Sequence, residues 1–210
     1  QRKLKKEIAL SMIPYSQQKI DARDIKAVLN VLKSDYLTQG PQVEKFEKKI
    51  NSIFKCRHSV AVNSATSALH VACLAIGIKK NDIVWTTPNS FVATSNCALY
   101  CNAKIDFIDI ENKTWNMSIL ELEKKLIIAK KKNKLPKLLI YVHLAGNPID
   151  QKAIFKLSKK YKFKIIEDAS HAFGAKYKNL HIGNCKWSDI AVFSFHPVKI
   201  ITTAEGGIAT

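Results

Sequence analysis

Apolar residues along the chain form short runs that alternate with longer periodic stretches. Runs rich in Val, Ile and aromatic residues predict strands at 59–63, 82–87, 104–110, 137–143, 163–168 and 189–195. Several of these runs are apolar at nearly every position, which is typical of strands covered on both faces. The runs therefore predict a sheet buried between two layers.

The longer stretches between these runs repeat every three to four residues and predict helices. Residues 42–54 and 64–77 follow this pattern, and Gly77 is a typical helix stop. Further helices are expected at 118–131 and 150–161. The helix at 21–34 carries four apolar residues on one face: Ile25, Val28, Leu29 and Leu32. Strands and helices in alternation predict an α/β domain with a largely parallel sheet.

Charge changes this picture little. The net charge is +17, but only three of the 34 basic residues are arginines, at Arg2, Arg23 and Arg57. Arginine is the residue that grips phosphate and reads bases bidentately, and no segment interleaves basic with aromatic residues. We therefore expect solvated lysines, including a loop at 129–137, and no nucleic-acid partner. A basic binding protein remains the alternative.

Targeting and cysteine patterns point to the cytoplasm. No apolar run is long enough to span a bilayer, and the basic start lacks the apolar core of a signal peptide, so no membrane partner is expected. The five scattered cysteines suggest free thiols, and Cys97 and Cys101 lack the further ligands of a metal site.

The chain lacks an initial Met and stops at "EGGIAT", inside a predicted strand. We expect an N-terminal arm at 1–20 and, at 21–210, a large domain of a longer protein.

Polar residues gather where predicted strands end, and ligands of open α/β sheets bind there. "NSATSALH" turns a strand into a helix, so free N–H groups and the hydroxyls of Thr66 and Ser67 suit a phosphate. A plain helix cap by Asn63 or Ser64 explains the same stretch equally well. Phe91, past the next strand, suits stacking on a planar ligand, although a core position is the usual fate of such a residue.

Three further residues suggest chemistry. Asp168 ends a buried strand and needs a partner, whether a ligand, a helix cap or an ion pair. His171 is suited to donate to a ligand oxygen, or is structural. Lys199 follows Ser194 and the turn at Pro197. An amine among apolar residues has a lowered pKa and attacks carbonyls, although a surface lysine is the default. Together, a phosphate seat, an aromatic ring, a carboxylate and an amine suit pyridoxal phosphate.

Five markers in order carry a family resemblance: residues 37–50, 61–72, 87–97, 165–175 and 193–207. From Ile13 onward the sequence resembles the DegT-type nucleotide-sugar aminotransferases, which are pyridoxal-phosphate enzymes of fold type I. It is most similar to transaminases that aminate C4 of a UDP-linked 4-keto-6-deoxy amino sugar toward pseudaminic acid. The resemblance implies the large domain of that fold, a mostly parallel sheet with helices on both faces, without the C-terminal small domain.

The resemblance implies a role for each candidate at the cofactor ring. Lys199 forms the Schiff base and moves the proton. Asp168 pairs with the ring nitrogen, His171 lies near the phenolic oxygen, and Phe91 stacks on the ring.

The same resemblance implies the remaining contacts and the reaction. Thr66, Ser67 and Ser194 hold the cofactor phosphate, while Tyr15 and Thr38 line the sugar-nucleotide side. A cytoplasmic homodimer passes an amino group from glutamate to the keto-sugar in a ping-pong sequence. The alternatives are a dehydratase or a regulatory homologue of the same fold; the presence of Lys199 argues against the dehydratase branch in which histidine replaces this lysine.

Overall fold

The computed structural model describes residues 14–210. Most of the expected arm, and Ile13, where the family resemblance begins, lie outside the described residues. The helices are α2 (Ala22–Leu32), α3 (Pro41–Phe54), α4 (Ala65–Ile76), α5 (Ala93–Tyr100), α6 (Ile119–Lys131) and α7 (Gln151–Tyr161), with a 3-10 turn at Leu144–Gly146.

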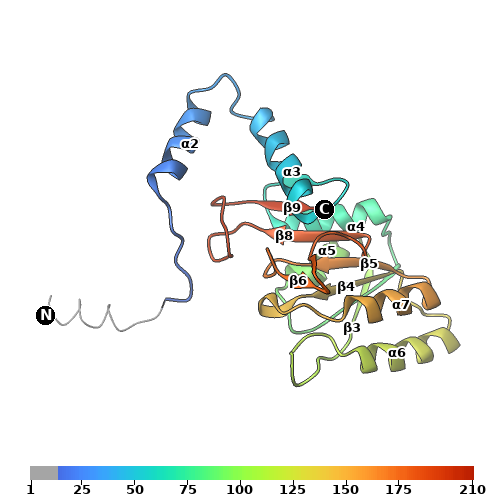
Figure 1. The fold of residues 1–210 in the computed structure, drawn as a ribbon. Helices are drawn as coiled ribbons and strands as arrows, with labels where there is room; N and C mark the ends of the chain where they lie inside the picture. The colour runs from blue at the N-terminus through green and yellow to red at the C-terminus, as the bar shows by residue number, and fades with distance from the viewer. Residues whose placement is uncertain (1–13) are drawn as a thin grey trace, which may run out of the picture.

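A sheet of seven strands forms the centre of the molecule (Figure 1). Its order is β1 (Val60–Val62), β9 (Gly207–Ala209), β8 (Ile190–Ser194), β5 (Lys164–Asp168), β4 (Leu138–Val142), β2 (Ile83–Thr86) and β3 (Lys104–Phe107). The pairs from β8 to β3 are parallel, and β9 lies antiparallel between β1 and β8. The prediction of a largely parallel sheet is confirmed.

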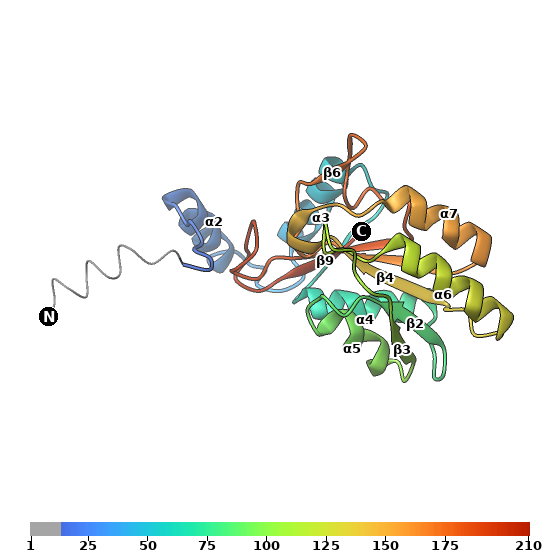
Figure 2. The same ribbon diagram turned by 90° about the horizontal axis from the view of Figure 1, so that it is seen from below.

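Helices cover both faces of the sheet, as predicted (Figure 2). Side chains alternate along β5, so Ile166 packs in the core under α4 and α5, while Ile165 packs in the core under α6 and α7. The third helix of this second face is α3, whose Phe54 stacks on Phe193 of β8 with ring centroids 4.7 Å apart. Every residue of β4 is buried, which explains its unbroken apolar sequence.

Three features differ from the sequence predictions. The pattern did not predict α5, nor the hairpin of β6 (Lys176–Tyr177) and β7 (Leu180–His181). The lysine run at 129–137 is not all loop, because α6 continues to Lys131.

The apolar face of α2 is exposed, although its helix was predicted. Figure 1 shows this helix away from the sheet. Each of its four apolar residues is exposed: Ile25, Val28, Leu29 and Leu32. No residue of α2 is buried within the described part of the chain, so the amphipathic pattern predicts burial that residues 14–210 do not provide.

Candidate active site

The strand ends singled out in the sequence meet at one edge of the sheet. Gly207, the first residue of β9, pairs with Val62 at the end of β1 and with Ser194 at the end of β8. Neighbouring strands lie about 4.8 Å apart, so Ser194 lies about 10 Å from the end of β1. Asp168 ends β5, the next strand beyond β8.

Helix α4 begins at this same edge, and two residues separate it from β1. Ser64 is its N-cap, and the Ser64 hydroxyl accepts a 3.1 Å hydrogen bond from the Ser67 N–H. The cap interpretation is therefore correct for Ser64. It is compatible with anion binding, because the first four N–H groups of a helix have no partner inside it and one cap satisfies only one of them. The side chains of Thr66 and Ser67 are half-buried here.

Asp168 is buried and is held by two elements. Its Oδ2 accepts a 2.7 Å bond from the hydroxyl of Thr94 on α5, and its Oδ1 accepts a 3.2 Å bond from the Ser170 N–H. Within residues 14–210 it forms no ion pair, so a buried carboxylate is left with free lone pairs. No sequence pattern distinguishes Thr94, which lies about one helical turn after Phe91.

Lys199 and His171 share an electrostatic environment with Asp168. Lys199 is half-buried in the loop between β8 and β9. Its backbone N–H donates to the carbonyl of His196 at 2.9 Å. Burial lowers the pKa of the Lys199 amine, and the negative charge of Asp168 opposes this shift. Desolvation likewise lowers the pKa of His171, and the positive charge of Lys199 lowers it further.

His171 also carries an unused hydrogen-bonding atom. Its Nδ1 is buried and has no partner among the described residues. A buried polar atom without a partner is costly, and a ligand oxygen or nitrogen at this place would satisfy it. A ligand with polar ring substituents therefore fits this end of the site.

Phe91 is not a core residue, because 72% of its surface is exposed. It lines a cavity of about 280 Å³ together with Thr87, Ser90 and Thr94. The Thr87 hydroxyl is buried and has no partner in the described structure. An exposed aromatic ring beside an unpaired hydroxyl is suited to contact a planar ligand.

The structure does not bring Tyr15 and Thr38 into this group. Tyr15 is 90% exposed, although the hydroxyl of the adjacent Ser16 donates to the Pro197 carbonyl at 3.5 Å. Thr38 lies in the exposed connection between α2 and α3, and no hydrogen bond within residues 14–210 joins it to the strand ends.

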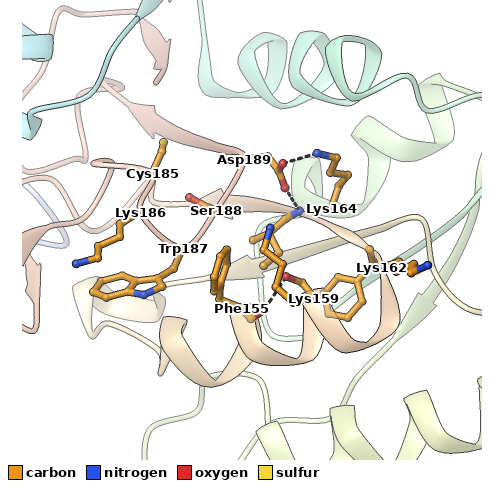
Figure 3. Close-up of a pocket in the computed structure, with 12 residues that line it drawn as sticks. Phe155, Lys159, Lys162, Lys164, Cys185, Lys186, Trp187, Ser188 and Asp189 are labelled. Atoms are coloured by element: carbon orange, nitrogen blue, oxygen red, sulfur yellow. Dashed lines mark hydrogen bonds and ion pairs between the residues drawn. The ribbon is translucent and has the colours of Figure 1, made fainter.

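A second cavity, of about 400 Å³, lies at the opposite ends of the strands (Figure 3). It is lined by four lysines, and three of them contact a carboxylate or an aromatic ring. Lys164, the first residue of β5, forms a 2.7 Å ion pair with Asp189. Lys186 lies 5.2 Å from the ring centre of Trp187. This cavity contains none of the predicted site residues.

Two kinds of feature are absent from residues 14–210. None of the helices described there combines the length and the apolar character needed to cross a membrane. The same residues hold no cluster of three or more His, Cys, Asp or Glu side chains that suits a metal ion. The five cysteines are free thiols, and three of them are buried: Cys73, Cys97 and Cys101.

Comparison with known proteins gives similar sequences and similar structures. Over 196 residues the chain is 44% identical to a UDP-4-amino-4,6-dideoxy-N-acetyl-beta-L-altrosamine transaminase of Campylobacter jejuni, covering 93% of this chain and 50% of that protein. The structure of Helicobacter pylori PseC, an aminotransferase involved in the biosynthesis of pseudoaminic acid, is 37% identical with a TM-score of 0.84. That match covers 93% of this chain and 51% of the PseC chain.

A third similar structure is the putative sugar aminotransferase Spr1654 of Streptococcus pneumoniae in its PMP-form. It is 28% identical with a TM-score of 0.86, over 95% of this chain and 52% of that one. The chain thus spans about half the length of the relatives it matches. Residues 18–210 match the model of the DegT/DnrJ/EryC1/StrS aminotransferase family, to which this chain belongs.

Proposed function

We propose that the protein containing this chain is a pyridoxal-phosphate-dependent nucleotide-sugar aminotransferase. It moves an amino group from an amino acid, glutamate, to a nucleotide-linked 4-keto-6-deoxy sugar. The main support is that Asp168, Ser194 and the start of α4 lie at one edge of the sheet in a chain from an aminotransferase family. The charge of Asp168 acts on both Lys199 and His171 there. The transaminase names of the Campylobacter and Helicobacter relatives support the sugar class.

The residues present fit the cofactor. The start of α4, with Thr66, Ser67 and Ser194 nearby, supplies neutral donors for a phosphate. Asp168 offers a buried carboxylate with free lone pairs to a protonated ring nitrogen, and the unpaired Nδ1 of His171 suits a ring oxygen. When bound, pyridoxal phosphate supplies an electron sink for cleavage of bonds at the α-carbon of the amino donor.

Each chain residue then has a definite task. Burial shifts the pKa of Lys199 downward, which favours the neutral amine; this amine would hold the cofactor aldehyde and would carry a proton. Asp168 holds the positive charge of the ring. Phe91 orients the ring by stacking, and Tyr15 and Thr38 contact the sugar nucleotide. These roles, the division into an arm at 1–20 and a large domain at 21–210, the homodimer and the cytoplasmic location stay predictions.

The test uses the full-length natural protein. We expect a visible cofactor chromophore that borohydride bleaches and fixes covalently to a peptide containing Lys199. In Lys199→Ala the fixation is lost, while the exposed control Lys156→Ala keeps it. Fixation that survives in Lys199→Ala would refute the assignment of the nucleophile.

Substrate class is tested separately. With glutamate as donor, 2-oxoglutarate formation is measured against UDP- and dTDP-linked 4-keto-6-deoxy sugars, and only keto-sugar-dependent turnover supports the proposal. Turnover with a simple 2-oxo acid alone would contradict the sugar assignment.

A further inference from the structure

We propose that Thr94 is a positioning residue for Asp168, and that Ser90 in turn holds Thr94. This inference rests on the proposed function, because Asp168 is the residue expected to contact the cofactor ring. Neither Thr94 nor Ser90 is among the residues predicted to contact the cofactor. Their hydroxyl groups fix the orientation of the buried Asp168 carboxylate.

The contact joins two parts of the fold. Thr94 lies in the first turn of α5, and its hydroxyl donates to Asp168 Oδ2 at 2.7 Å, across 74 residues of sequence. Both side chains are buried, with 1% and 3% exposed. Water therefore does not replace the bond if it is lost, and hydrogen bonds to buried charged groups are among the strong ones.

Chemistry fixes the direction of the hydrogen bonds. A carboxylate only accepts, so the single hydroxyl proton of Thr94 points to Asp168. The oxygen of Thr94 also lies 2.5 Å from the hydroxyl oxygen of Ser90. Since the Thr94 proton is committed, Ser90 must donate to Thr94. The result is a directed chain from Ser90, which lines the cavity beside Phe91, through Thr94 to the carboxylate.

The two oxygens of Asp168 are held from different sides. Thr94 binds Oδ2 from α5, and the Ser170 N–H binds Oδ1 from the turn after β5. Two fixed points restrict rotation of the carboxylate and direct its remaining lone pairs. The group is thus oriented before any ligand binds, which is the condition for a strong charged contact with the ring nitrogen.

The test compares cofactor binding by variants of the full-length protein, measured as pyridoxal phosphate dissociation constants from the cofactor absorbance. Thr94→Val keeps the shape and removes the donor, so we expect affinity to fall about 10-fold, the scale of a lost hydrogen bond to a charged group. Thr94→Ser restores the donor and should bind within about threefold of wild type. Ser158→Ala is the matched control, because its hydroxyl donates to the Phe155 carbonyl of its own helix at 2.8 Å and lies at the opposite ends of the strands.

A double-mutant cycle separates positioning from a general structural effect. In an Asp168→Ala background, Thr94→Val should change the dissociation constant less than twofold, because its target is gone. Wild-type affinity in Thr94→Val, or an undiminished effect in the Asp168→Ala background, would overturn the inference. If Thr94→Val does not fold, the half-buried Ser90→Ala takes its place, with an expected loss of about threefold. Absence of cofactor uptake by wild type would instead overturn the proposed function.

Discussion

Gly207 lies directly against the backbone of Ser64. A Cβ atom at position 207 would be 2.4 Å from the Ser64 carbonyl carbon and 2.5 Å from the Ala65 nitrogen. Both are backbone atoms at the start of α4, so no flexible side chain is available to move aside. Strand β9 and the N-terminus of α4 can approach this closely only because residue 207 is a glycine.

This contact predicts a specific defect in Gly207→Ala. The added methyl group must displace the first turn of α4, and such overpacking typically costs about 1–3 kcal/mol in free energy of unfolding. Because that turn is the proposed phosphate seat, we also expect loss of pyridoxal phosphate affinity. Urea unfolding and cofactor titration measure the two effects.

Gly77→Ala is the matched control for this prediction. Gly77 ends the same helix, at the other end, with a φ of 83° and no atom within 4 Å of an added Cβ. Its backbone strain should lower stability by about 1 kcal/mol, yet leave cofactor affinity unchanged. Equal loss of affinity in both variants would mean that overall stability, and not the geometry of the first turn of α4, controls cofactor binding.

Replacing Phe91 should change cofactor affinity with almost no change in stability. Because its ring is 72% exposed, Phe91→Ala should change the free energy of unfolding by no more than about 0.5 kcal/mol. A stacked ring is worth about 0.5–1.5 kcal/mol, so cofactor affinity should fall about 2- to 10-fold, and Phe91→Tyr should retain it. Tyr100→Ala, an exposed aromatic at the far end of α5, should leave affinity unchanged. Unchanged affinity in Phe91→Ala would exclude stacking.

The sequence predicted the sheet well because burial on both faces leaves an unmistakable run of apolar residues, as in 138–142. It did not predict α5, whose N-cap Val92 makes no side-chain cap and whose Thr, Ser, Asn and Cys are weak helix formers. The β6–β7 hairpin was also not predicted. Its turn residues Lys178 and Asn179 both have positive φ, but they are not the Asn-Gly or Asp-Gly pair that is typical of such turns.

The sequence predicts some residues of the candidate site and not others. Asp168 is conspicuous in the sequence because a carboxylate at the end of a buried strand needs a partner. Its actual partner, Thr94, leaves no such sign, since a threonine 74 residues away becomes adjacent only when α5 packs on the sheet. The apolar face of α2 illustrates the converse, because periodicity predicts an amphipathic helix without identifying the surface that covers it.

A buried polar cluster lies on the other face of the sheet from Asp168. Glu167 accepts hydrogen bonds from His143 Nε2 at 3.0 Å, from Gln151 at 2.6 Å and from the Ser188 hydroxyl. The Ile149 N–H donates to His143 Nδ1, so the histidine proton lies on Nε2 and points to the carboxylate. The cluster ties His143, which directly follows β4, to β5 and α7.

Glu167→Gln should therefore be strongly destabilising. An amide places its own NH₂ donors against groups that already donate, so buried donors lose their acceptor, at a cost of about 3 kcal/mol in free energy of unfolding. The control Glu123→Gln, at a side chain that is 46% exposed, should change stability by at most about 0.5 kcal/mol. Coincident urea transitions for wild type and Glu167→Gln would contradict a structural role for the cluster.

The coupling of His171 to its neighbours predicts opposite pKa changes in two variants. Burial and then the charge of Lys199 lower the pKa of His171, whereas Asp168 raises it. Lys199→Met removes a positive neighbour, so His171 should accept a proton at higher pH than in wild type. Asp168→Asn removes a negative neighbour, so protonation should require lower pH. NMR titration of the imidazole signals in cofactor-free protein measures both, with the exposed His58 as internal reference. Because fold changes would move both variants alike, shifts in the same direction would show that the three side chains do not form one electrostatic unit.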